Sequence, residues 1–142
     1  MRKIVGILKD SIKSGLQGTH YADRLLGSQS VNFKEQLQNK RLVDKGALNN
    51  VVMYVSALME VKSSMGVIVA APTAGSCGTL PGAVIGTADF LGSSDDEIIE
   101  AMLVAGLIGI FIATQSTFAV EVAGCGLAYG SWGCMASTAL VC

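Results

Sequence analysis

The chain has 142 residues, a formal net charge of −1 at pH 7 and 51% hydrophobic residues. This length suits one domain that buries a core, and we expect a single domain over residues 1–142. Lys and Arg form no basic stripe after the first residues, which argues against a nucleic-acid-binding protein. The N-terminal residues lack an unbroken apolar stretch with a cleavage site, so we expect no secretory signal, a cytoplasmic protein and reduced thiols.

The first third of the chain predicts short helices. Residues 1–13 place Ile4, Leu8 and Ile12 at helical spacing, which predicts an amphipathic helix ended by Gly15. The polar segment 16–42 predicts helical pieces around residues 22–26 and 33–38.

A longer helix is predicted next. Asp44 is expected to cap it, and it should run to about residue 65. Its apolar face is predicted to consist of Leu48, Val51, Val52, Val55, Leu58 and Met59.

The second half is apolar and is also predicted to be helical. Residues 67–71 suggest an extended piece, and Pro81 suits the first turn of a helix that Gly92 would end. The sequence SDDE at 94–97 is a capping box that should open a helix over about 95–113. The last stretch, 118–141, should become helical after Gly130. The pattern predicts a compact all-α domain with buried Gly-rich loops.

A membrane protein is the alternative fold. Residues 98–113 are apolar except for Glu100, and Glu121 is the only charge in 118–141. These runs could form a helical hairpin in a bilayer that packs through Gly106 and Gly109. The first run is short for a span, and both lack aromatic belts and flanking Lys and Arg, so we disfavour this alternative.

The stretch APTAGSCGTLPG, residues 71–82, is built almost entirely from small side chains. Such residues let the backbone approach a ligand, and glycine amides can point into one concavity that accepts an anion. Thr73, Ser76 and Thr79 add hydroxyl groups, and the following helix N-terminus favours a carboxylate or phosphate. The alternative is that Gly and Ala only allow two buried helices to cross closely. Because no Lys follows as in a Walker loop, nucleotide phosphate is disfavoured.

The four cysteines are Cys77, Cys125, Cys134 and Cys142. Their spacing matches no paired zinc motif, and the simplest interpretation is that they are buried free thiols. Glycines flank Cys125 on both sides, which would suit a cluster ligand, but Cys125 and Cys134 alone cannot complete an iron–sulfur site.

Three segments carry a family resemblance. MEVKSSMGVIVAAPTAGSCGTLPG resembles the loop ExNxxMGxIxAxPTAGSxGxxPG of the α chain of iron–sulfur-dependent L-serine dehydratases, also called L-serine ammonia-lyases. VAGLIGIFIA followed by AGCG is similar to that family's helix and ligand-cysteine region, and SGLQGTHYADRLL is similar to its SGLTGGDAxKL. The likeness covers nearly the whole chain.

The resemblance implies an enzyme that converts L-serine to pyruvate and ammonia. A [4Fe–4S] cluster held by three cysteines would act as Lewis acid on the substrate hydroxyl. Cys125 matches one cluster ligand. The loop would bind the substrate carboxylate through Thr73, Ala74, Gly75 and Ser76. The family also implies a β-chain partner and a homo- or hetero-oligomer.

Several positions depart from the family pattern. The other two ligands lie in a motif like CDPxxGLVxxPC, which would fall after Cys142, so we expect a copy truncated at its C-terminus. We interpret Cys77, Cys134 and Cys142 as structural thiols, with a rearranged site using Cys77, Cys125 and Cys134 as the alternative. Several pocket positions are also less polar than in the family. An impaired or noncatalytic helical relic therefore stays open, and no catalytic base is assigned: we expect His20 at the surface, and Glu121 could be a base or a helix-end acid.

Overall fold

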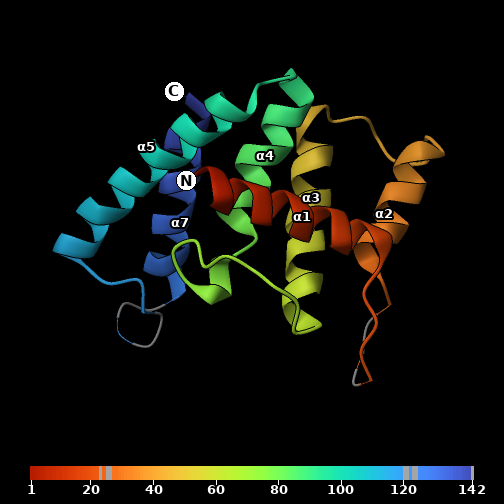
Figure 1. Ribbon diagram of the computed structural model, residues 1–142, viewed down its shortest axis with the longest axis horizontal. Helices are drawn as coiled ribbons and strands as arrows, with labels where there is room; N and C mark the ends of the chain where they lie inside the picture. Colours follow the sequence, from red (N-terminus) through yellow and green to blue (C-terminus); the bar gives the residue numbers. More distant parts are fainter. Residues whose placement is uncertain (23, 25–26, 120–121, 123–124, 142) are drawn as a thin grey trace.

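The computed structural model describes residues 1–142 apart from 23, 25–26, 120–121, 123–124 and 142, and the side chains of 125–129, 131 and 132. The described residues form helices and no strands, which confirms the all-α prediction. The elements are α1 (Arg2–Gln17), α2 (Gln29–Gln38), α3 (Ala47–Ser63), the 3₁₀ turn η1 (Ala74–Ser76), α4 (Thr79–Leu91), α5 (Asp95–Gln115) and α7 (Cys125–Val141). In Figure 1, α3, α4 and α7 stand side by side, α1 crosses in front of them and α2 lies outside α3.

Helix α1 crosses α3 at Gly15. A Cβ atom added to Gly15 would lie 2.5 Å from the carbonyl oxygen of Ala57, so only glycine permits this approach. The helix therefore continues through Gly15 and ends at Gly18, whose φ of 105° suits glycine. The prediction that Gly15 ends the helix was wrong, because that glycine serves helix packing.

Glycines also set the contact between α4 and α3. A Cβ atom on Gly82 would lie 2.5 Å from Cγ2 of Val55, and one on Gly86 would lie 2.9 Å from Cα of Val51. Close helix crossing, one of the two interpretations of the small-residue stretch, is thus confirmed for Gly82.

Helix α3 differs from its prediction in its start and in its buried face. Its N-cap is Gly46, and the Asp44 carboxylate accepts a hydrogen bond from the Gly46 amide instead of capping the helix itself. The helix buries Asn49, Met53, Ala57, Leu58 and Val61, whereas the predicted Leu48 and Val52 are exposed. Because α3 is apolar on several sides, the glycines of α1 and α4 decide which side is buried.

Three boundaries in the second half can be compared with the sequence. Helix α4 ends at Gly92 in the left-handed conformation, as predicted. The Ser94–Glu97 capping box of α5 is confirmed: the Ser94 amide donates to Glu97 Oε2 at 2.6 Å and the Glu97 amide donates to Ser94 Oγ at 3.3 Å. Helix α7 begins at Cys125, earlier than the predicted Gly130. Its contacts with α4 and α5, where Met135, Ala136 and Ala139 are buried, outweigh the low helix propensity of its glycines.

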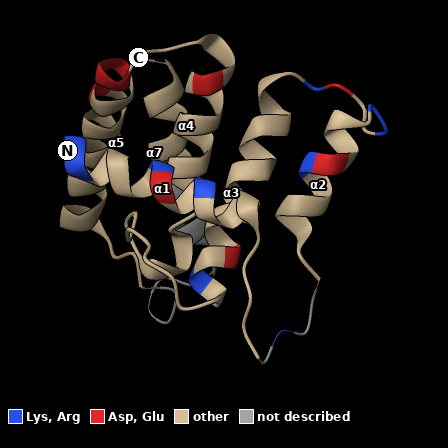
Figure 2. Cartoon of the chain, turned by 45° about the vertical axis from the view of Figure 1, so that its right-hand side comes forward, with Lys and Arg blue, Asp and Glu red and all other residues tan. Residues whose placement is uncertain are grey.

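The core lies where α1, α3, α4, α5 and α7 meet, and its most deeply buried large residues are Leu8, Leu58, Ile85 and Ile98. Helix α5 has the length and hydropathy of a membrane span, but this is weak support for one, since a core helix of a soluble protein has the same properties. In this protein 22% of the apolar window of α5 is buried, and the buried residues of the helix are Ile98, Met102, Ala105 and Gly109. Beyond its acidic first turn, α5 carries hardly any charge (Figure 2).

Candidate functional site

Several helix ends and connecting segments lie at one end of the bundle. Figure 1 shows residues 18–22 and 64–78 and the end of α5 on its lower side, where α3 ends and α4 and α7 begin. The predicted ligand Cys125 is the first residue of α7, so its backbone lies at this end. Its side chain lies outside the described residues.

The predicted substrate-binding loop closes around the Ser76 hydroxyl. Ser76 Oγ accepts a hydrogen bond from the Thr73 amide at 3.2 Å and lies 3.0 Å from Thr73 Oγ1 and 3.1 Å from the Ala71 carbonyl oxygen. Ser76 is buried, Thr73 is half-buried, and Ala74 and Gly75 are exposed. The structure thus brings the four residues together, with the buried Ser76 hydroxyl holding the loop.

Cys77, the next residue, is fully buried. Its Sγ lies 4.0 Å from Sδ of Met59 in α3. Burial raises the pKa of the Cys77 thiol, and the positive charge of Lys62 opposes this rise only in part. A buried neutral thiol beside a thioether agrees with its prediction as a structural thiol.

Cys134 is the other cysteine whose side chain the structure describes, and it forms no site with Cys77. Cys134 is exposed, unlike the buried thiol expected from composition, and Cys142 lies outside the described residues. Cys134 follows Cys125 by nine residues in α7, which corresponds to about 13 Å of helix. Among the described side chains, no three His, Cys, Asp or Glu residues are close enough to hold a metal ion.

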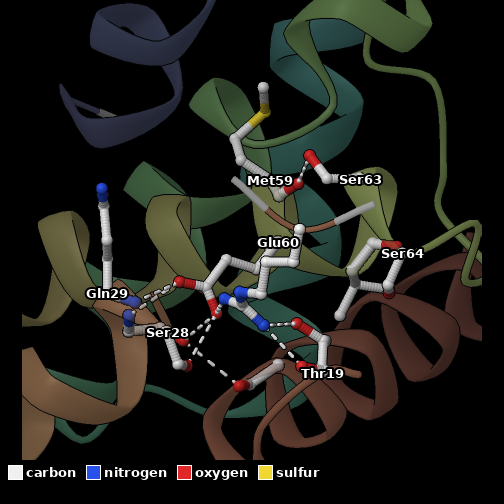
Figure 3. Close-up of polar contacts among 11 residues, drawn as sticks. Thr19, Ser28, Gln29, Met59, Glu60, Ser63 and Ser64 are labelled. Atoms are coloured by element: carbon white, nitrogen blue, oxygen red, sulfur yellow. Dashed lines mark hydrogen bonds and ion pairs between the residues drawn. The ribbon is translucent and has the colours of Figure 1, made fainter. Parts of the chain in front are cut away.

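Glu60, in the last turn of α3, makes the most extensive polar contacts at this end of the molecule (Figure 3). Its carboxylate accepts hydrogen bonds from the Gln29 amide at 2.5 Å, the Ser30 amide at 3.0 Å, the Ser30 hydroxyl at 2.8 Å and the Ser28 hydroxyl at 3.2 Å. These donors form the N-terminus of α2, where unpaired amides favour a negative charge. Glu60 therefore caps α2 from another helix.

The same carboxylate holds the segment before α2. Arg24 lies 3.5 Å from Glu60 Oε2, and its guanidinium donates to the carbonyl oxygen of Thr19 at 2.5 Å and to the Thr19 hydroxyl at 3.0 Å. It also stacks over the ring of Tyr21, with its Cζ 5.4 Å from the ring centroid. Side chains on Arg24 and Glu60 are largely buried, so this pair is more than a surface ion pair.

Two adjacent residues of α3 thus fix two loops. Met59 contacts Cys77 behind the loop 73–76, and Glu60 contacts Arg24 and residues 28–30. The sequence analysis missed Glu60, Arg24, Ser28 and Ser30, although the quoted motifs include Glu60 and Arg24. The available signal was that Glu60 is the one acidic residue of this helix and lies near its end. His20 is exposed, as predicted, and Glu121 lies outside the described residues.

The chain belongs to the serine dehydratase family, since the family model described as "Serine dehydratase alpha chain" matches residues 1–142. Within that class it is similar to particular bacterial proteins. It is 26% identical over 137 residues to the probable L-serine dehydratase, alpha chain, of Bacillus subtilis (strain 168), covering 96% of this chain and 46% of that protein.

Two further relatives match over shorter stretches. The identity is 38% over 85 residues with the probable L-serine dehydratase, alpha chain, of Latilactobacillus sakei (60% of this chain, 41% of the relative). It is 40% over 82 residues with the L-serine dehydratase, alpha chain, of Peptoniphilus asaccharolyticus (58% and 28%). The chain spans less than half the length of these relatives, and no solved structure matches it.

Proposed function

We propose that this chain is the part of an L-serine dehydratase α chain that holds the substrate carboxylate while L-serine is converted to pyruvate and ammonia. The observation that carries the proposal is the loop 73–76, which is closed around Ser76 and leaves residues Ala74 and Gly75 exposed. The family match and the names of the relatives support the substrate and the reaction.

The reaction explains why such a loop is useful. The α-proton of serine is weakly acidic and hydroxide is a poor leaving group, so elimination of water requires a substrate held in one orientation. Main-chain amides provide that grip without a bulky side chain. Loss of water gives aminoacrylate, which hydrolyses to pyruvate and ammonia. In this proposal Ser76 shapes the loop, and the Ala74 and Gly75 amides together with the Thr73 hydroxyl contact the carboxylate.

The described residues do not by themselves fit a [4Fe–4S] cluster. Such a cluster with one open iron needs three thiolates, and the described cysteines offer one buried neutral thiol, Cys77, and one exposed thiol, Cys134. We keep Cys125 as a proposed cluster ligand and the β chain as a proposed partner, both on the strength of the family resemblance.

Serine binding by the loop can be tested on the chain itself. We expect L-serine to shift the backbone amide resonances of Ala74 and Gly75 in a nitrogen–proton correlation spectrum. Serinol keeps the amine and hydroxyl but lacks the carboxylate, and it should leave them unchanged. Equal shifts with both compounds, or none with L-serine, would contradict carboxylate binding.

A matched pair of variants tests the amide directly. Ala74→Pro removes one donor at the first position of η1, where proline is tolerated, and Thr73 already has the extended conformation that a following proline requires (φ −112°, ψ 162°). Ala74→Gly keeps the donor. Serine binding should weaken about fivefold or more in Ala74→Pro and stay near the wild-type value in Ala74→Gly.

Enzymatic function is a separate measurement. Because the described cysteines do not supply three thiolates, anaerobic reconstitution is done with the proposed β-chain partner present, and iron and sulfide analysis and a pyruvate assay with L-serine should then show a cluster and turnover. Serine binding without iron uptake or pyruvate would instead assign the chain as a noncatalytic relic of the family.

A further inference from the structure

A cleft lies on the face of the bundle where α1 passes over α2, α3 and α4. Its volume is about 370 Å³, within the size range of small-molecule sites. Its floor is apolar: Ile12 and Leu16 of α1 face Ile85 of α4. Ile12 and Ile85 are buried, so the floor belongs to the core and is rigid.

The rim of this cleft concentrates positive charge. Three of the ten Lys and Arg residues of a chain with net charge −1 line it, namely Lys9, Lys13 and Lys34. Lys9 pairs with Asp95 of α5. Within the part of the chain that the structure describes, Lys13 and Lys34 form no ion pair. A cleft with one dominant sign of charge and low-dielectric walls attracts counter-ions.

The far wall is polar and already paired. The Tyr54 hydroxyl donates to Asp89 Oδ2 at 2.8 Å. Burial, together with that hydrogen bond and the charge of Asp89, raises the pKa of Tyr54 to about 12, so the hydroxyl stays protonated at neutral pH. Asp89 repels an anion from this wall, which leaves Lys13 and Lys34, on the α1 and α2 side, as the partners for a negative group.

We propose that this cleft binds a small organic anion, with its carboxylate or phosphate group held by Lys13 and Lys34 and its apolar body lying on Ile12, Leu16 and Ile85. Lysine ammonium groups bind such anions as point charges. The apolar body of the ligand adds binding free energy, because its surface is removed from water where it contacts the floor of the cleft.

The cleft is distinct from the loop 73–76. Asp89 follows Thr79, the first residue of α4, by ten residues, which places the cleft wall about 15 Å along α4 from the end that carries the loop. The proposed ligand therefore occupies a second site and is not the serine of the first.

The test uses hexanoate, hexyl phosphate and 1-hexanol, three probes with the same apolar body, and inorganic phosphate as the anion alone. We expect at least one of the two organic anions to bind saturably, with a dissociation constant of roughly millimolar order, and to shift amide resonances of residues 12–17 and 34. Comparing hexanoate with hexyl phosphate identifies the preferred head group. Hexanol and inorganic phosphate should bind at least about fivefold more weakly, because each lacks one of the two required parts.

A matched pair of double variants assigns the head-group contact. Lys13→Gln with Lys34→Gln should lower the affinity for the preferred anion about fivefold. Lys3→Gln with Lys45→Gln removes the same charge from exposed positions that do not line the cleft, and it should leave the affinity unchanged.

The proposal is overturned if neither organic anion saturates the shifts, if hexanol or inorganic phosphate binds as tightly as the preferred anion, or if both double variants lose affinity equally. The probe comparison is made on the wild-type chain, so it stands even if a variant folds poorly. The test of the first site instead follows the Ala74 and Gly75 resonances on addition of L-serine, so either proposal can fail without the other.

Discussion

At the scale of single residues, Glu60 is the side chain whose replacement should break the most polar contacts. Five groups on Arg24 and residues 28–30 contact its carboxylate, and only 13% of its side chain is exposed. Burial by itself would raise the pKa of Glu60, but the hydrogen bonds from the Ser30 amide and hydroxyl, the Gln29 amide and the Ser28 hydroxyl outweigh it and lower the pKa. The folded state therefore favours the ionised form.

The sign of the resulting pH dependence follows from this direction. A carboxyl group whose pKa is lower in the folded state contributes stability above its unfolded pKa of about 4.3, and this stability is lost as the pH falls through the folded value. At pH 7 we expect Glu60→Gln to lower the free energy of unfolding by roughly 1–3 kcal/mol. The difference from wild type should shrink toward pH 3, as measured by urea denaturation at each pH.

Glu35→Gln is the control for Glu60. Glu35 is exposed on α2, and its side chain makes no hydrogen bond or ion pair within the described part of the chain. Its replacement should change stability by less than about 0.5 kcal/mol. If the deficit of Glu60→Gln were the same at pH 3 as at pH 7, the loss would come from shape and not from charge.

The Glu60 contacts also mark a limit of sequence-based prediction. The loop 71–82 could be located from composition because small residues are adjacent in the sequence. Glu60 and Ser30 are thirty residues apart, and only the crossing of α3 beside α2 brings them together. Ser76 illustrates a subtler limit: its hydroxyl could be noticed, but not that it would turn inward.

At the scale of elements, local signals predicted where helices lie better than which side they bury. The α5 capping box and the α4 C-cap were correct because each depends on residues within a few positions. The buried face of α3 and the start of α7 depend on neighbouring helices: of the predicted α3 face Leu58 is buried but Leu48 and Val52 are exposed, and α7 begins before Gly130. A glycine in a helical sequence can end a helix or allow two helices to pack closely. Gly92 ends a helix, whereas Gly15 and Gly82 bring two helices together.

Two glycine-to-alanine changes should have opposite effects on the free energy of unfolding, depending on whether the glycine is needed for helix packing. A Cβ atom at Gly82 would meet the backbone nitrogen of Val55 at 2.9 Å as well as its side chain, so Gly82→Ala should push α4 away from α3 and destabilise the protein by roughly 1–3 kcal/mol. At Gly6, in the exposed side of α1, a Cβ atom would meet nothing within 4 Å. Gly6→Ala should stabilise the protein by roughly 0.5–1 kcal/mol through helix propensity.

Urea denaturation of the two variants beside wild type provides the measurement, with the denaturant slope checked for two-state behaviour. Equal and favourable effects of both changes would show that α3 and α4 do not pack through glycine.

At the scale of the whole molecule, apolar surface remains uncovered along one side of α5. Leu103, Leu107, Ile110 and Phe111 recur at helical spacing and are each 53–62% exposed. Ile110 also lines an apolar groove of about 360 Å³ that reaches from Ile4 of α1 to Phe118 and has Gly106 and Gly109 among its lining residues. Contiguous apolar patches of this kind are uncommon on monomeric soluble proteins.

This surface predicts self-association of the isolated chain, driven by removal of α5 from water. Sedimentation velocity at increasing concentration should show a rise in average mass, and Leu107→Glu should shift the chain toward monomer because a charge at the centre of the patch would have to be buried on association. Leu48→Glu, at a position of similar exposure on α3, should leave the association unchanged, since it introduces the same charge outside the patch. Association that persists in Leu107→Glu and disappears in Leu48→Glu would move the contact surface from α5 to α3.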